Sequence, residues 1–304
     1  MSILTTSALS KRYKTVQALN QVNIAIPQGA VYGILGPNGS GKTTLLGIVM
    51  DVLKATSGAY LWNGQPGSDT QRKRIGTLLE TPNFYPYLSA ERNLEIAAAI
   101  KGYSKADIPR VLKIVNLFER KDSAFSTYSL GMKQRLAIAA ALLGDPEVLV
   151  FDEPTNGLDP AGIAEIRQLI VTLHASGKTI IMASHILDEV EKVCTHVTII
   201  QKGTIKASGT VTEVLHAGEQ QNETLIEIAA GDLLQLQSAV QELPGLKTAA
   251  LKQDFLLLHC SATVTPESIN KFFFEKGIIL SYLSVKKKSL ETRFLEITGT
   301  TSDR

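Results

Sequence analysis

The 304-residue sequence contains only two cysteines and no long hydrophobic run. Two cysteines cannot form a framework of several disulfides, so we expect Cys194 and Cys260 to be reduced thiols in the interior of a cytosolic protein. The longest unbroken apolar stretch, residues 136–143, is far shorter than the roughly 18 residues that a membrane-spanning helix needs. The opening residues lack an apolar run behind their charges, which predicts no secretory signal. We therefore expect any membrane role to depend on a partner.

The sequence also lacks a large excess of either charge. Its 31 basic and 29 acidic residues give a net charge of +2. Proteins that coat nucleic acid or an anionic bilayer usually carry a strong basic surplus, so we expect no nucleic-acid partner. The length exceeds the roughly 250 residues at which a single core stops growing, and this favours two domains.

The first part of the chain, residues 1–217, alternates short strands with helices. Four apolar runs are typical of strands buried on both faces, at residues 31–35, 74–79, 148–151 and 179–184. A helical subdomain of about residues 84–144 interrupts the series, and residues 195–207 resemble a hairpin that turns at Lys202 and Gly203. This order predicts an α/β fold with a mostly parallel sheet.

Residues 218–304 follow a different order. The polar segment 218–224 is typical of a linker. Strands are expected at residues 225–229, 246–251, 255–260 and 278–285, and helices at 232–242 and 266–276. The β-α-β-β-α-β succession predicts a small ferredoxin-like α+β module, in which no residue suggests catalysis.

One motif fits the phosphate-loop pattern G-x-x-x-x-G-K-[ST], between a predicted strand and a predicted helix. It consists of Gly36, Pro37, Asn38, Gly39, Ser40, Gly41, Lys42 and Thr43. The glycines let the backbone curl so that its N–H groups face phosphate oxygens. Lys42 supplies a positive charge, the Thr43 hydroxyl is a ligand for Mg²⁺, and we assign Thr44 to the same nucleotide site. A plain glycine-rich turn is disfavoured because the flanking segments also match, and the motif identifies a P-loop NTPase.

A second motif is the apolar strand 148–151 followed by two carboxylates. Asp152 is placed to hold Mg²⁺, and Glu153 to act as the general base toward the attacking water. Such a strand end is often only solvated, but together with a phosphate loop it predicts hydrolysis.

A third motif gives a family resemblance. Ser129, Leu130, Gly131, Met132, Lys133 and Gln134 resemble the signature sequence L-S-G-G-Q of ABC transporter ATPases, with Leu130 in place of the first glycine. Ser129 is a good helix N-cap, and Gly131 lets phosphate approach the first turn.

The resemblance implies roles for further residues across the first domain. Tyr13 matches an aromatic residue that stacks on adenine, Asp159 matches a loop that touches the opposite nucleotide site, and His185 matches a histidine that contacts the γ-phosphate. It also implies ATP and Mg²⁺ as cofactors and a P-loop NTPase sheet domain with an inserted helical subdomain.

Glu80 departs from the family pattern, which usually has Gln after this strand. Glu at this position resembles lantibiotic self-immunity exporters. Residues 128–136 and 289–299 resemble the wider bacitracin-resistance and ABC-2 exporter group. Our hypothesis is that Glu80 ligates Mg²⁺ or its attacking water and couples the ATP state to the membrane partner; the alternative is a solvent-facing residue at a strand end.

The resemblance implies the ATP-hydrolysing subunit of an ABC exporter, at the cytoplasmic face of the membrane. Separate membrane subunits would carry the transported molecule, and a second ATPase subunit, most simply another copy, would complete two nucleotide sites. Two alternatives stay open: a soluble ABC-type ATPase acting on ribosomes or DNA, and a regulatory nucleotide binder without hydrolysis. The presence of Lys42, Asp152, Glu153 and His185 disfavours the second alternative.

Overall fold

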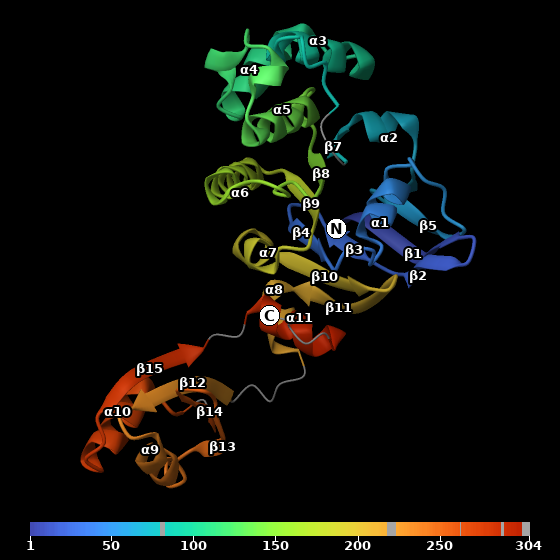
Figure 1. The fold of residues 1–304 in the computed structure, drawn as a ribbon. Helices are drawn as coiled ribbons and strands as arrows, with labels where there is room; N and C mark the ends of the chain where they lie inside the picture. Colours follow the sequence, from blue (N-terminus) through green and yellow to red (C-terminus); the bar gives the residue numbers. More distant parts are fainter. Residues whose placement is uncertain (80–82, 218–222, 262, 287–288, 300–304) are drawn as a thin grey trace. The chain divides into compact units, whose positions relative to one another are not determined.

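A computed structural model describes residues 1–79, 83–217, 223–261, 263–286 and 289–299 (Figure 1). The chain divides into two units. The first contains Met1–Val214 together with the chain from Phe294 onward, and the second contains Leu215–Arg293. Glu80 and most of the expected linker lie outside the described residues.

The first unit contains a six-stranded sheet with the order β11-β10-β4-β9-β8-β7. Its strands are β4 (Val31–Leu35), β7 (Ile75–Leu78), β8 (Val148–Asp152), β9 (Thr179–Ser184), β10 (His196–Gln201) and β11 (Thr204–Thr210). All neighbours pair in parallel except β10 and β11, which form the expected hairpin around Lys202 and Gly203. Every residue of β4, β8 and β9 is buried, as the apolar runs predicted.

A second sheet in this unit was not predicted from the sequence. It contains β1 (Ser2–Tyr13), β2 (Val16–Val22), β3 (Ala25–Pro27), β5 (Ser57–Trp62) and β6 (Gln65–Pro66). The pairing of β1 with β2 and with β5 shifts register along the strands, and Ala8 and Gln21 have positive φ angles. These bulges break the alternation of apolar and polar residues by which a strand is recognised in a sequence.

One hydrophobic core connects both sheets to α1 (Lys42–Val49). Leu46 of α1, Ile34 of β4 and the fully buried Trp62 of β5 belong to it. The Trp62 indole donates a hydrogen bond to the Val49 carbonyl at 2.9 Å. The helix that follows the phosphate loop is therefore held by packing against both sheets and by a hydrogen bond at its end.

Residues 89–143 contain several helices, as expected for the helical subdomain. The main ones are α3 (Ala90–Lys101), α4 (Ile108–Ile114) and α5 (Leu130–Leu142), which lie together at the top of Figure 1. Gly102, with a φ of 74°, ends α3, and the side chains of Ser89 and Ser129 cap the starts of α3 and α5. The other helices of the first unit include α2 (Asp69–Lys73), α6 (Pro160–Ala175) and α7 (Leu187–Val193), and α8 (Val211–His216) leads into the second unit.

The second unit has the predicted β-α-β-β-α-β succession. Its elements are β12 (Glu223–Ala230), α9 (Leu233–Val240), β13 (Leu246–Leu251), β14 (Leu256–Ser261), α10 (Pro266–Glu275) and β15 (Leu280–Lys286). The sheet is antiparallel with the order β13-β14-β12-β15, and Leu258, Phe273 and Ile226 are in its core.

The last helix, α11 (Leu290–Thr298), returns the chain to the first unit, whereas the sequence suggested a single module over residues 218–304. Gln201 of β10 donates a hydrogen bond to the Thr298 carbonyl at 2.8 Å. The second unit is therefore inserted into the first, between α8 and the end of α11.

Both cysteines are buried and free, one in each unit. Among the described residues, no helix combines the length and the apolar character needed to cross a bilayer.

Candidate active site

The predicted phosphate loop connects β4 to α1, and its backbone packs tightly against neighbouring segments. A Cβ atom added to Gly41, whose φ is 110°, would lie 2.5 Å from the Ala18 carbonyl oxygen. One added to Gly36 would lie 2.3 Å from the Ile200 carbonyl oxygen. Only glycine fits these positions, so the loop conformation requires the residues that the motif specifies.

The turn of the β10–β11 hairpin supports the loop from outside. Gly203 donates its backbone N–H to the Ser40 carbonyl at 2.9 Å and accepts one from Asn20 at 2.8 Å. The sequence predicts this turn but not its contact with the loop. Its two central residues both have positive φ angles, 48° at Lys202 and 73° at Gly203, which marks a tight hairpin but says nothing of its neighbours.

The loop ends at the first turn of α1, where backbone N–H groups have no acceptor within the helix. Thr43 is exposed there and Thr44 is half-buried. Pro37, Asn38 and Gly39 form the exposed outer part of the loop. This arrangement of N–H groups around a helix start is suited to binding an anion such as phosphate.

Lys42 has its ammonium group inside the loop and is only 5% exposed. Its Nζ donates to the carbonyl oxygens of Gly36 at 2.8 Å and Pro37 at 3.3 Å. The same nitrogen lies 3.4 Å from Glu153 Oε1. The cation is thus held by two carbonyl oxygens of the loop and by the Glu153 carboxylate.

Glu153 and His185 follow the carboxyl ends of β8 and β9 and meet there. The other carboxylate oxygen of Glu153, Oε2, lies 2.8 Å from His185 Nδ1 and 3.4 Å from the His185 backbone nitrogen. Glu153 has a φ of 49°, which is uncommon outside glycine, and donates its own N–H to the Ala183 carbonyl at 3.0 Å. The backbone therefore holds the Glu153 carboxylate between Lys42 and His185.

The oxygen atoms around the loop fit a bound magnesium ion and phosphates. Asp152 ends β8 with a buried carboxylate, and Thr43 presents its hydroxyl from α1. Ser40 Oγ is buried and has no hydrogen-bond partner among the described residues. Carboxylate and hydroxyl oxygens are the ligands that Mg²⁺ prefers, and an unpaired buried hydroxyl is costly unless a ligand satisfies it.

Ser129 and Asp159 each cap the helix that follows them. Ser129 Oγ accepts the Met132 N–H at 3.3 Å at the start of α5, as the sequence predicted, and Asp159 Oδ1 accepts the Gly162 N–H at 3.1 Å at the start of α6. A Cβ atom added to Gly131 would meet no atom within 4 Å, so this turn is open. Neither cap makes a hydrogen bond to the phosphate loop in the described part of the chain.

Tyr13 lies at the end of β1 and is 42% exposed, with Lys11 Nζ 5.0 Å from the centre of its ring. An exposed ring of this kind is available for stacking on a base.

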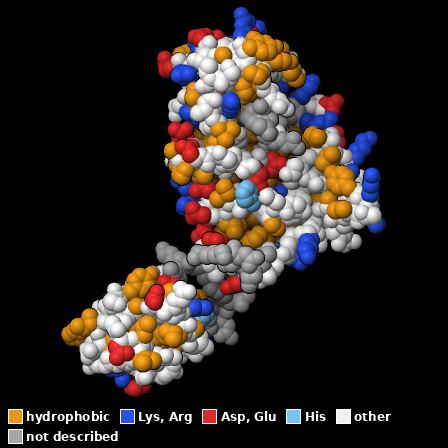
Figure 2. Space-filling model, viewed as in Figure 1, with side chains coloured by type: hydrophobic (Ala, Val, Ile, Leu, Met, Phe, Trp, Pro, Cys, Tyr) orange, Lys and Arg blue, Asp and Glu red, His pale blue; other side chains and the backbone are white. Residues whose placement is uncertain are grey.

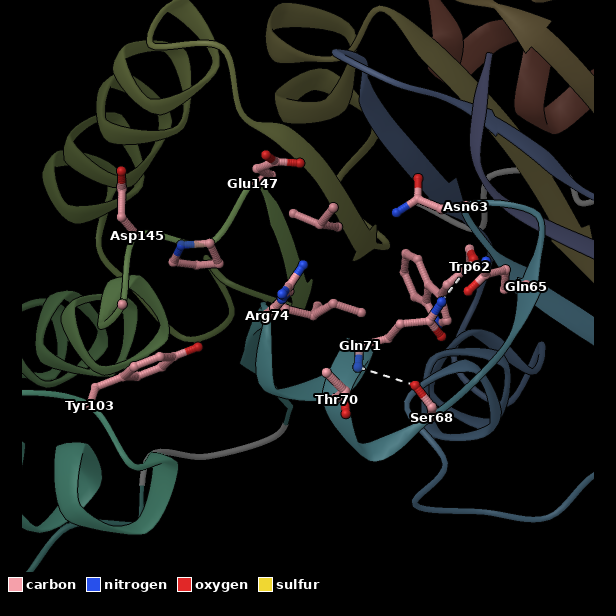
Figure 3. A pocket seen from close by; sticks show the side chains of 14 residues that line it. Trp62, Asn63, Gln65, Ser68, Thr70, Gln71, Arg74, Tyr103, Asp145 and Glu147 are labelled. Carbon is pink, nitrogen blue, oxygen red and sulfur yellow. Dashed lines mark hydrogen bonds between the residues drawn. The ribbon is translucent and has the colours of Figure 1, made fainter.

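A separate cavity of about 760 Å³ lies at the other edge of the sheet (Figure 3). Arg74 and Glu147 line it, and each directly precedes a strand, β7 and β8 respectively. The phosphate loop, Glu153 and His185 instead follow the carboxyl ends of their strands. The cavity is therefore not part of the nucleotide site.

Comparison with known proteins agrees with this geometry. The family model described as ABC transporter matches residues 19–156, which include the phosphate loop and Glu153. The bacitracin transport ATP-binding protein BcrA of Bacillus licheniformis is 36% identical over 98% of this chain and 98% of its own length. BcrA of Enterococcus faecalis is 33% identical over 98% and 96%. The lantibiotic transport ATP-binding protein SrtF of Streptococcus pyogenes is 41% identical over 65% of this chain and 86% of its own.

Solved structures of the same kind resemble the chain. An ATP-binding subunit of an ABC transporter has a TM-score of 0.63 and 31% identity, and covers 70% of this chain and 92% of its own. The dimeric ATP-binding cassette MJ0796, in a post-hydrolysis state with ADP and Pi, has a TM-score of 0.62 and 26% identity over 68% and 98%. Because relatives above 30% identity match almost the whole length, this chain belongs to the ATP-hydrolysing, ATP-binding subunits of ABC transporters.

Proposed function

We propose that the chain energises export of a bacitracin-like antimicrobial peptide, from the cytoplasmic face of the membrane and together with separate membrane subunits. One observation carries this proposal. The two BcrA relatives match over 98% of the chain, and their alignments therefore include the second unit. The match to SrtF spans 197 residues, fewer than the first unit alone contains, so a lantibiotic substrate is the weaker assignment.

The residues around the phosphate loop have different roles in ATP binding and hydrolysis. The loop N–H groups and Lys42 bind the phosphates of ATP, while Tyr13 stacks on the adenine. Thr43 and Asp152 hold Mg²⁺, which when bound neutralises phosphate charge. Glu153 takes the proton of the attacking water, and His185, 2.8 Å from its carboxylate, orients that base.

Two copies of the chain complete two sites. Ser129, Gly131 and Asp159 of one copy face the nucleotide bound in the loop of the other. Three features support this arrangement: the open turn at Gly131, the caps that keep both helix starts in shape, and the dimeric state of the related cassette MJ0796.

The docking surface for a membrane subunit is a groove of about 370 Å³ beside α3. Phe84, Tyr85 and Ile100 line it, and of these Tyr85 is 50% and Ile100 is 79% exposed. Figure 2 shows hydrophobic side chains gathered over this helical part of the molecule. Exposed apolar side chains around a groove are typical of a protein interface, and the groove begins three residues after Glu80 in the sequence.

The test is peptide resistance in the host. Deleting the gene should raise sensitivity to bacitracin, the wild-type gene should restore resistance, and Glu153→Gln should not. Unchanged bacitracin sensitivity in the deletion strain would exclude the peptide assignment, and a change confined to lantibiotics would identify that class instead.

A further inference from the structure

Leu130 is an apolar side chain between two small residues at the start of α5. It follows the cap Ser129, precedes Gly131, and is 47% exposed. An isolated exposed leucine needs no explanation, but this one is the first residue of the helix that is proposed to face phosphate. A leucine side chain cannot bind an anion, so the contribution of this side chain must come from packing.

The structure shows what Leu130 packs against. A Cβ atom added to Gly157 would lie 3.4 Å from Leu130 Cδ2, in van der Waals contact, so the leucine side chain lies beside the loop that leads to Asp159. Gly157 has a φ of 75°, a conformation that a residue with a side chain rarely adopts. Leu130 therefore connects the signature turn to the Asp159 loop within one chain.

We propose that Leu130 is a positioning residue of the composite nucleotide site. It holds the signature turn, residues 129–131, next to the Asp159 loop, so that both segments contact the nucleotide of the partner copy together. Its exposed half is buried by the partner copy when the dimer closes. This inference rests on the proposed pairing of two chains, and its occupant is a second copy of this chain carrying ATP in its phosphate loop.

Burial of this side chain has two expected effects. Removing apolar surface from water stabilises the closed dimer, and the symmetry of the dimer applies the gain twice. Excluding water from the turn also strengthens the hydrogen bonds that the Gly131 region makes to phosphate. Both effects act on closure, so they should change the ATP requirement more than the rate of hydrolysis at saturation.

The experiment truncates the side chain in the full-length protein. Leu130→Ala keeps the helix start intact, because alanine is a good helix former. We expect the ATP concentration for half-maximal hydrolysis to rise about tenfold, equivalent to about 1.4 kcal/mol, while kcat changes by less than about threefold. In a Glu153→Gln background, the protein concentration for half-dimerisation with ATP should rise by a similar factor.

Two control variants test whether the apolar side chain at this position is the cause. Leu130→Met keeps an apolar side chain of similar size, so both concentrations should stay close to those of the wild type. Leu251→Ala, at a leucine 52% exposed in the second unit, should change neither concentration.

Mixed dimers separate this inference from the proposed function. In a dimer of one Lys42→Ala chain and one Lys42-intact chain, purified through two different tags, only the intact loop works. Leu130→Ala on the Lys42→Ala chain faces that loop and should raise the ATP requirement most. On the intact chain it faces the damaged loop, so only the weaker dimer closure should remain and the ATP requirement should rise less. If Ser129→Arg on the Lys42→Ala chain has no effect, the composite site itself is wrong. If Ser129→Arg abolishes hydrolysis while Leu130→Ala is silent there, or acts only on the intact chain, the role of Leu130 is overturned alone.

Discussion

The ammonium nitrogen of Lys42 lies 3.4 Å from Glu153 Oε1, so opposite charges join the phosphate loop to the end of β8. Glu153 also lies 2.8 Å from His185 through its other oxygen. A phosphate group that enters the loop is an anion and competes with Glu153 for Lys42. Binding of phosphate and release of the Glu153 carboxylate from Lys42 are therefore linked events.

Glu153→Gln should slow hydrolysis by roughly 10²- to 10⁴-fold, because the general base is lost. ATP binding should be retained or strengthened, because a neutral side chain competes less for Lys42. The variant should accumulate as an ATP-bound dimer in size exclusion. Glu147→Gln, at the other end of the same strand, is the matched control and should hydrolyse ATP at the wild-type rate. Turnover close to wild type in Glu153→Gln would remove this residue from the role of base.

Ser129 should act on the partner copy's nucleotide. Lys42→Ala chains and Ser129→Arg chains should each be inactive alone, since each homodimer has two damaged sites. Mixing them leaves one intact composite site in every mixed dimer, so about half of the activity per dimer should return if one site works independently. Hydrolysis that stays absent in purified mixed dimers, or that depends on no dimer at all, would contradict the sandwich arrangement.

Glu80 should matter through its charge. An ionised carboxylate accepts hydrogen bonds but cannot donate them, and under our hypothesis that of Glu80 would add a negative charge near Mg²⁺. Glu80→Ala should reduce peptide resistance in cells more than it reduces basal ATP hydrolysis, and Glu80→Gln, which keeps the shape, should retain more resistance. Equal and negligible effects of both substitutions would return Glu80 to a solvent-facing role.

Lys101, at the end of α3, should make stability depend on pH. Burial lowers the pKa of its ammonium group from 10.5 to about 8, and Nζ donates to the Ala140 carbonyl at 2.7 Å. At a pH between these two pKa values, Lys101 is protonated in the unfolded chain but mostly neutral in the folded protein. The free energy of unfolding should therefore rise as the pH increases through this range. Below about pH 8 both states are charged and the cost of burial is present in full.

The measurement is urea unfolding at about pH 7.5 and about pH 9.5. Lys101→Met cannot titrate, so its free energy of unfolding should increase by about 1 to 2 kcal/mol less than that of the wild type between these two pH values. This expected difference is reduced because the Lys101 side chain is only partly buried. Lys206→Met, at an exposed lysine of β11, is the control and should keep the wild-type increase. An identical pH profile for Lys101→Met and wild type would mean that Lys101 stays charged in the folded protein.

The sequence predicted the strands of the parallel sheet and the β-α-β-β-α-β succession of the second unit, because both follow strong local patterns. The boundaries expected for β4 and β9 agree with the structure, since buried parallel strands are continuous apolar runs. The antiparallel sheet containing β1 was missed, because bulges near Ala8 disrupt its alternation.

In the site, motif spacing identified the separate residues but not how they meet. The contacts of Glu153 with Lys42 and His185, and the position of Leu130 beside Gly157, bring together segments that are distant in the sequence. Such contacts depend on how strands and helices pack, which no local pattern contains.

The insertion of the second unit between α8 and α11 makes it, in polymer terms, a long loop of the first unit. While this loop is folded, its ends are held by its own structure, and α11 has little conformational freedom to lose. If the second unit unfolds, α11 can fold with the first unit only by closing a long flexible loop. The entropic cost of closing that loop grows with the logarithm of its length. The stability of the two units is thus coupled through chain connectivity, and a truncation after residue 214 would remove the part of α11 that belongs to the first unit as well as the whole of the second unit.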